Sequence, residues 1–198
     1  MPKKKSIKLS VANFLREVGQ ITNYLVRIQS TSDLKGSDKT RCHDYAVIWL
    51  YRAFENLMLD SLSGALNNDT STLSTSAGFS LPKHLSIEVC QFLVTGRGYF
   101  DFRGREGLIK KVREYVPETH YLVIALKKAK YKTALEQLIA LRNLAAHGSD
   151  QSKRSALKVL NLTRLSSAGS WLKVGERFGT IAGLLVALAG EIEAAAPY

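Results

Sequence analysis

The chain has 198 residues, 45% of them hydrophobic, which is typical of one folded domain with a single core. Its formal charge is +11, from 28 Lys and Arg against 17 Asp and Glu. This excess favours phosphate polyanions or anionic membrane surfaces as partners, and the scattered basic residues favour nucleic acid over a membrane surface. The two cysteines, Cys42 and Cys90, form neither a disulfide framework nor a metal-binding set, and they favour a reducing, cytoplasmic location.

The first half of the chain predicts two long helices. The start, MPKKKSIKLS, lacks the apolar segment of a signal peptide and is expected to be a solvated basic tail. Apolar residues at three- and four-residue spacing predict helices over 9–29 and 41–66. The polar stretch 30–40 separates these helices, and the Ser-, Thr- and Asn-rich stretch 67–80 is predicted to be a loop.

The second half predicts further helices, with a polar connection over 149–155. Their expected ranges are 84–94, 105–116, 119–147 with a break near 127–130, and about 170–195. No alternating strand pattern persists, so the predicted fold is all-α: an up-and-down four-helix bundle with extra short helices. We expect a single domain overall, with residues 1–40 as the basic tail and first helix and 41–198 as the rest of the bundle. The apolar run 180–190 is too short to span a bilayer, so we expect a core helix and no membrane association.

Two charged side chains of opposite sign fall on apolar helix faces. At 100° per residue, Arg142 lies near the middle of the apolar arc of 119–147, and Glu55 lies at the centre of the stripe of 41–66. Asp44 lies on the same line as Glu55, nearer the helix start. A lone charge is costly in a core, so we expect Arg142 to meet Glu55 or Asp44 beside a solvent-reaching cleft. The alternative is a structural ion pair that fixes the helix register.

Asn143 and His147 lie at the edge of the same arc, four residues apart and therefore on one side of the helix. Gly148 is typical of the position just past a helix end, where the helix dipole favours the imidazolium form. A histidine beside an arginine suits proton transfer and phosphate chemistry. The ordinary alternative for a histidine at a helix end is a capping role.

The segment RNLAAH (142–147) resembles the Arg-x4–6-His motif of the HEPN superfamily, which often has a polar residue directly after the arginine. HDYAVIWLYRAFENLMLDSL (43–62), with Glu55 among apolar residues, is similar to the early helix of RiboL-PSP-type HEPN domains. GYFDFRGREGLIKKV (98–112) is similar to the family's middle segment. The resemblance covers about residues 40–195.

The resemblance implies a metal-independent endoribonuclease without a cofactor, which acts as a homodimer with a composite active site. The RNA 2′-hydroxyl would attack the adjacent phosphorus and leave a 2′,3′-cyclic phosphate and a free 5′-hydroxyl. His147 would act as general acid or base, and Arg142 would stabilise the phosphorane. Asn143 would orient His147 or hold a phosphate oxygen. Glu55 and Asp44 would position the arginine.

The family further suggests a toxin or antiviral role, with an antitoxin or defence protein as partner. The alternative is a non-catalytic HEPN-like module that binds RNA or a protein.

Two basic segments are candidates for RNA binding. The turn region TGRGYFDFRGR (95–105) interleaves arginines with aromatic residues, and these residue types contact phosphates and stack on bases. Its aromatic side chains are instead expected to anchor the turn in the core. The run KKAKYK (127–132) suits a surface that follows an RNA backbone, or is simply a solvated face. The candidate RNA-binding residues are Arg97, Arg103, Arg105, Lys127, Lys128 and Lys130.

Overall fold

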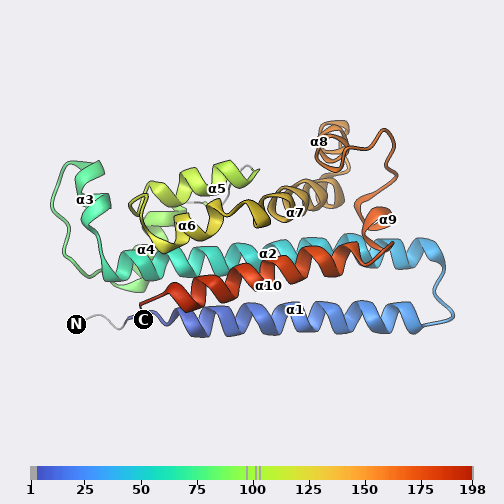
Figure 1. The fold of residues 1–198 in the computed structure, drawn as a ribbon, viewed down its shortest axis with the longest axis horizontal. Coiled ribbons are helices and arrows are strands. Elements are labelled where there is room, and N and C mark those ends of the chain that lie inside the picture. The colour runs from blue at the N-terminus through green and yellow to red at the C-terminus, as the bar shows by residue number, and fades with distance from the viewer. Residues whose placement is uncertain (1–3, 97, 101, 103, 198) are drawn as a thin grey trace. The chain divides into compact units, whose positions relative to one another are not determined.

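The protein is described by a computed structural model, which covers residues 4–96, 98–100, 102 and 104–197. This part of the chain contains ten α-helices and no strand, so the predicted all-α class is confirmed (Figure 1). The helices are α1 (Ile7–Ser30), α2 (Gly36–Asn68), α3 (Ser71–Ala77), α4 (Ile87–Thr95), α5 (Gly104–Arg113), α6 (Tyr121–Lys127), α7 (Ala129–His147), α8 (Asp150–Leu160), α9 (Ala168–Leu172) and α10 (Arg177–Ala195).

Helix breaks follow local backbone chemistry. The predicted break near 127–130 is confirmed, because α6 ends at Lys127 and α7 begins two residues later. The expected continuous helix from about 170 to 195 is wrong. Gly175 and Glu176 adopt φ values of 62° and 55°, in the left-handed region that a right-handed helix cannot include. These two residues separate α9 from α10.

Two short helices replace predicted loops. The stretch 67–80 contains α3, in which no residue is buried, so it carries no apolar pattern that would have revealed it. The connection 149–155 contains the start of α8, and the Ser149 hydroxyl caps this helix by accepting a hydrogen bond from the Ser152 amide. Serine is a preferred residue at this capping position.

The described chain divides into two compact units, and the helices α1, α2, α7 and α10 each contribute residues to both. Unit 1 is drawn from 1–14, 55–132 and 188–198, and unit 2 comprises 15–54 and 133–187. The predicted boundary at residue 40 coincides with no limit of either unit. The four-helix bundle with HEPN-like topology stays a prediction.

Unit 1 has a core of leucines from three helices. Leu62 and Leu66 of α2, Leu108 of α5, and Leu122 and Leu126 of α6 are completely buried. Helix α5 packs against α6. The start of α1 is held to the end of α2 by polar contacts: the ammonium of Lys5 lies 2.8 Å from an Asp60 carboxylate oxygen, and its amide donates to the Asn67 side chain.

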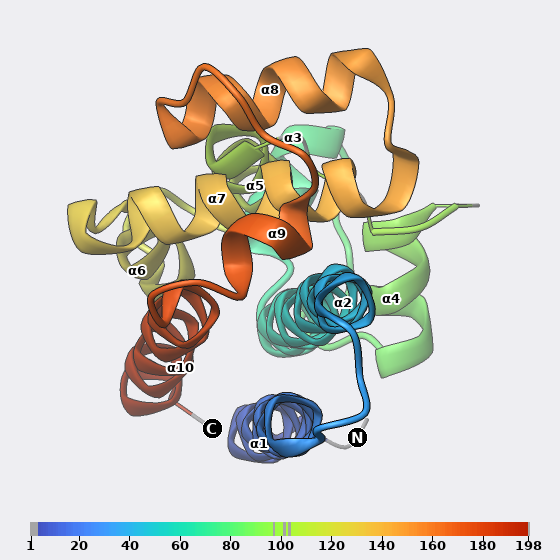
Figure 2. The same cartoon turned by 90° about the vertical axis from the view of Figure 1, so that its right-hand side faces the viewer.

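Unit 2 is organised around α7 and the first part of α2. Figure 2 shows α8 alongside α7 and α9 against α2. The amide of Gly169 in α9 donates to the Asp44 carboxylate in α2, at 2.6 Å. A Cβ atom at position 169 would lie 2.0 Å from the carbonyl oxygen of Thr40. Only glycine therefore permits this approach of the two backbones.

Helix α10 is mostly apolar, with Arg177 at its start and Glu191 and Glu193 near its end. By length and composition alone it meets the criterion for a membrane-spanning helix within the described chain, a criterion that core helices of soluble proteins also meet. Its Leu185, Leu188 and Ile192 side chains are completely buried. Of the apolar stretch, 39% is buried, so one face of the helix packs inside the protein.

Candidate functional site at the end of helix α7

Arg142 lies half-buried in α7, against an aromatic ring and an amide. Its guanidinium carbon is 4.4 Å from the centre of the Tyr51 ring of α2, and its Nη1 donates to the Asn143 Oδ1 at 2.8 Å. The ring face attracts the cation, and the amide oxygen accepts one of its protons. The arginine in the middle of the apolar arc is therefore accommodated without a carboxylate in contact with it inside unit 2.

The contacts of Arg142 leave much of its hydrogen-bonding capacity unused. A guanidinium has five N–H donors, and within the described part of unit 2 Asn143 accepts from one nitrogen only. Arg142 is half-buried, so part of the residue is exposed to solvent. The planar fork of remaining donors matches the geometry of a phosphate.

His147 is the last residue of α7, and its side chain is exposed. Gly148 follows with φ of 58°, and its amide donates to the Leu144 carbonyl, so the expected helix end at this glycine is confirmed. Asn143 and His147 are one helical turn apart on the same side, whereas Arg142 and His147 are about 140° apart around the axis. Ala146, the residue before His147, is exposed as well. The buried face of α7 thus ends before His147.

The two carboxylates expected to support Arg142 have different positions. Asp44 accepts the Gly169 amide and thereby ties α9 to α2. Burial raises the pKa of this carboxyl above its ordinary value, against the lowering effects of the Gly169 hydrogen bond, of His43 and of Ser167. Glu55 is half-buried and belongs to unit 1. Its pairing with Arg142 of unit 2 stays a prediction.

Of the three arginines expected to face RNA over 95–105, Arg105 lies within the described residues. Arg97 and Arg103 lie outside the described residues. Arg105 is 8% exposed, and its Nε donates to the Leu126 carbonyl at 2.9 Å while its Nη1 meets Glu106. The guanidinium thus ties α5 to α6 from inside unit 1, so its assignment to an RNA-binding surface is corrected.

The aromatic residues of the same segment divide between core and surface. Phe100 and Phe102 are buried with ring centres 5.7 Å apart, which confirms the expected anchoring of this turn. Tyr99 is 93% exposed. Of the three aromatic side chains, it alone is available for stacking on a base.

Three lysines of 127–132, Lys127, Lys128 and Lys130, are exposed but paired. Lys127 contacts Glu118, while the Lys128 and Lys130 ammonium groups lie 2.9 and 2.6 Å from carboxylate oxygens of Glu191. Hydrogen bonds from Lys130 and Lys128 lower the pKa of Glu191 to about 2. Exposed ion pairs are weak, so these lysines remain exchangeable with phosphate groups.

The two cysteines form no disulfide, and the described residues contain no metal-binding cluster. Cys90 is buried, which raises the pKa of its thiol to about 11, and Cys42 is half-buried; neither forms a disulfide. Among the described residues, no group of three or more His, Cys, Asp or Glu side chains is arranged to hold a metal ion.

Sequence reasoning overlooked Tyr51 as a partner of Arg142. Tyr51 lies on the same predicted stripe as Glu55, one turn away, so the periodicity already placed its ring on that face. An arginine on an apolar face favours an opposite charge as its expected partner, although an aromatic ring also attracts a guanidinium.

Comparison with known protein families, with curated proteins and with solved structures gives no match to this chain.

Proposed function

We propose that this protein is a metal-independent endoribonuclease whose catalytic residues lie at the C-terminal end of α7. The observation that carries the proposal is the pairing of an anchored arginine with an exposed histidine on one helix end. Arg142 is held by Tyr51 and Asn143, and His147 projects into solvent one and a half turns later. The +11 charge of the chain favours a polyanionic substrate.

The proposed reaction needs only groups that these side chains carry. A neutral His147 takes the proton of the RNA 2′-hydroxyl, whose oxygen forms a bond to the adjacent phosphorus. The bond from phosphorus to the 5′-oxygen breaks, and that oxygen receives a proton from an imidazolium. Arg142 stabilises the additional negative charge of the phosphorane. The products are a 2′,3′-cyclic phosphate and a 5′-hydroxyl.

Two imidazoles are needed if one acts as base while another acts as acid. A second copy of the chain supplies the second imidazole, which makes the proposed active site a composite of two protomers. Coexpression of wild-type and His147→Ala chains in equal amounts tests this arrangement. Where each site needs the imidazole of both chains, only the wild-type dimers, about a quarter of all dimers, are active, and activity falls to about a quarter of the wild-type value. Sites contained within one chain would retain about half of it.

The function itself is tested by incubating the protein with single-stranded RNA in EDTA. Cleavage by the wild type, and its loss in His147→Ala and Arg142→Ala, support the proposal. His147 is exposed, so its removal leaves the packing of α7 intact and separates catalysis from stability. Cleavage by His147→Ala at the wild-type rate overturns the assignment of this residue.

A second candidate is a non-catalytic module that binds RNA or a protein partner. The contact of Arg142 with Tyr51 favours it, because that contact joins α7 to α2 and is sufficient reason for an arginine at this position. In this case Arg142→Ala lowers the melting temperature and leaves the RNA affinity of the folded protein unchanged. A variant that retains its melting temperature but loses cleavage contradicts this candidate.

A further inference from the structure

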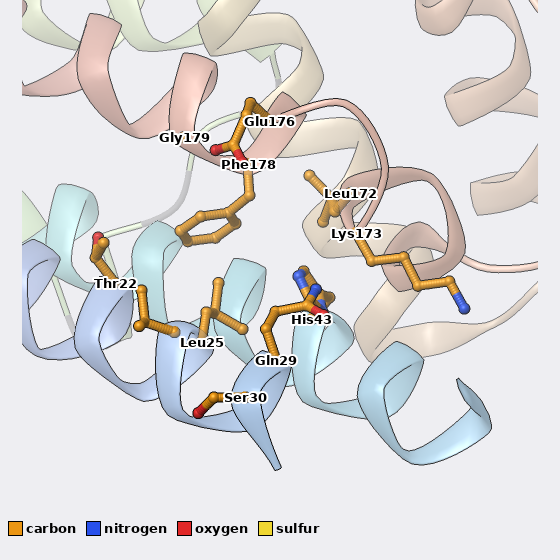
Figure 3. A pocket seen from close by; sticks show the side chains of 11 residues that line it. Thr22, Leu25, Gln29, Ser30, His43, Leu172, Lys173, Glu176, Phe178 and Gly179 are labelled. Carbon is orange, nitrogen blue, oxygen red and sulfur yellow. The ribbon is translucent and has the colours of Figure 1, made fainter. Parts of the chain in front are cut away.

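Unit 2 contains a pocket of about 510 Å³ between α1, α2 and the segment that joins α9 to α10. Figure 3 shows Leu25 and Phe178 on one side of it and His43 beside Gln29 and Leu172 on the other. This volume lies in the range of small-molecule sites, which are mostly apolar with a few placed polar groups. The lining residues are Thr22, Leu25, Val26, Gln29, Ser30, His43, Leu172, Lys173, Glu176, Phe178 and Gly179.

His43 is the polar group set deepest among these residues. Only 4% of its surface is exposed, and its Nδ1 lies 2.7 Å from the Lys39 carbonyl oxygen one turn earlier in α2. A carbonyl oxygen only accepts, so Nδ1 carries the hydrogen, and in the neutral ring Nε2 is an acceptor. Within the described part of the chain, no donor reaches Nε2. Nε2 is not among the buried atoms that lack a partner, so it is open to solvent, and a bound group with an O–H donates to it in place of solvent.

The other polar residues around the pocket are engaged elsewhere or lie at its edge. The Thr22 and Ser30 hydroxyls donate to carbonyls of their own helix. The Lys173 ammonium donates to the Gly36 carbonyl and to Thr40, and Figure 3 shows this side chain extended away from Leu25 and Phe178. Glu176 is exposed. Gln29 is exposed, and Figure 3 shows it beside His43. The pocket therefore offers the His43 acceptor, the Gln29 amide, apolar walls and little charge.

We propose that this pocket binds a small, neutral, mainly apolar molecule carrying a hydroxyl group, a phenol or an alcohol, whose O–H donates to His43 Nε2. Leu25, Leu172 and Phe178 cover its apolar body, and burial of that surface supplies most of the affinity. The hydroxyl supplies the selectivity, because an analogue without it leaves the imidazole nitrogen without a donor. This inference does not depend on the proposed ribonuclease activity.

The test uses 2-naphthol and its matched methyl ether, 2-methoxynaphthalene, which has the same ring but no donor. Each is titrated into the ¹⁵N-labelled full-length protein, and the ring-nitrogen shifts of His43 are followed. We expect saturable binding of 2-naphthol with a shift of the Nε2 resonance, and about tenfold weaker binding of the ether. Equal affinity for the two compounds overturns the role of His43, and the absence of saturable binding overturns the ligand site.

A blocking variant and a control locate the binding. Val26 lines the pocket and is 62% exposed, so Val26→Trp places a large ring at its mouth without disturbing the core. This variant is expected to weaken 2-naphthol binding at least tenfold, whereas His147→Ala at the end of α7 is expected to bind as the wild type does. Unchanged binding by Val26→Trp means that the compound is held elsewhere and contradicts the proposal.

Discussion

The guanidinium carbon of Arg142 lies 4.4 Å from the centre of the Tyr51 ring, so the charged residue of the apolar arc rests on an aromatic face. A cation over an aromatic ring contributes about 0.5–2 kcal/mol, depending on how far it is desolvated. The contact joins α7 to α2 inside unit 2 and fixes the orientation of the guanidinium. Lysine would not reproduce it, because an ammonium lacks both the planar face and the fork of donors.

A double-mutant cycle measures this contact. Tyr51→Leu, Arg142→Met and the double variant are unfolded in urea, and the coupling energy is taken from the three free energies. We expect about 0.5–2 kcal/mol, since the ring and the cation interact directly. The cycle cancels the other interactions of each side chain. Effects that add to within about 0.3 kcal/mol would mean that the two groups merely lie close together.

The close approach of α9 to α2 makes Gly169 sensitive to a single added carbon. In Gly169→Ala the new Cβ would lie 2.0 Å from the Thr40 carbonyl oxygen and 2.8 Å from the Asp44 amide nitrogen, so α9 must move away. We expect a loss of at least about 1–3 kcal/mol in the free energy of unfolding. Gly183→Ala in α10 is the matched control, because nothing lies within 4 Å of a Cβ there. That control is expected to gain up to about 1 kcal/mol from helix propensity.

His120 is expected to make stability depend on pH. Burial lowers the pKa of its imidazole to about 4, against a smaller raising effect of Asp69. Its Nδ1 accepts the Leu122 amide at the start of α6, which only the unprotonated nitrogen does. The unfolded chain binds a proton below pH 6.5, whereas the folded chain does so only near pH 4. The contribution of His120 to the free energy of unfolding is therefore fully present above pH 6.5 and is lost as the pH falls toward 4.

Urea unfolding at pH 7 and pH 4.5 measures this effect. Because His120 is partly exposed, we expect its protonation to lower the free energy of unfolding by only about 1–2 kcal/mol at pH 4.5. His120→Asn keeps a side-chain acceptor at the helix start but does not titrate, so its stability is expected to fall less over the same interval. An identical fall in both proteins would assign the pH dependence to other groups.

Glu191 is expected to restrain RNA binding by Lys128 and Lys130. Both ammonium groups contact its carboxylate, and Glu191→Gln removes that competitor. We expect RNA affinity at low salt to rise about threefold to tenfold, with a steeper dependence of log K on log salt. Glu193→Gln removes the same charge two residues away and serves as the control. An equal rise in both variants would reflect net charge alone and would contradict a role for these lysines.

The long helices were predictable because their apolar faces repeat at helical spacing over many turns. Helices α1 and α2 exceed the predicted ranges by only a few residues at each end. Helix α3 was not predictable from apolar pattern, since none of its residues is buried. The break between α9 and α10 depends on Glu176 adopting a positive φ, which its residue type does not favour. Such local conformations are set by tertiary packing rather than by propensity.

The sequence predicted which residues belong to the candidate site better than it predicted the contacts that they make. Periodicity placed Arg142 on the packed side of α7 and put the helix end at Gly148, both as observed. It did not reveal the Asp44 contact with Gly169, because those residues are 125 positions apart and no local pattern links them. The distribution of charged residues did not show that Arg105 is buried either. A long basic side chain can lie inside or outside the protein, and its residue type alone does not tell which.

The ends of the RNA fragments test the central claim most directly. Single-stranded RNA and DNA of the same sequence are incubated with the wild type in EDTA, and the products are analysed by mass spectrometry. The proposed use of the 2′-hydroxyl predicts fragments of the RNA only, ending in 2′,3′-cyclic phosphate and beginning with 5′-hydroxyl, and none with His147→Ala. Fragments with 3′-hydroxyl and 5′-phosphate ends, cleavage of the DNA, or intact RNA would contradict it.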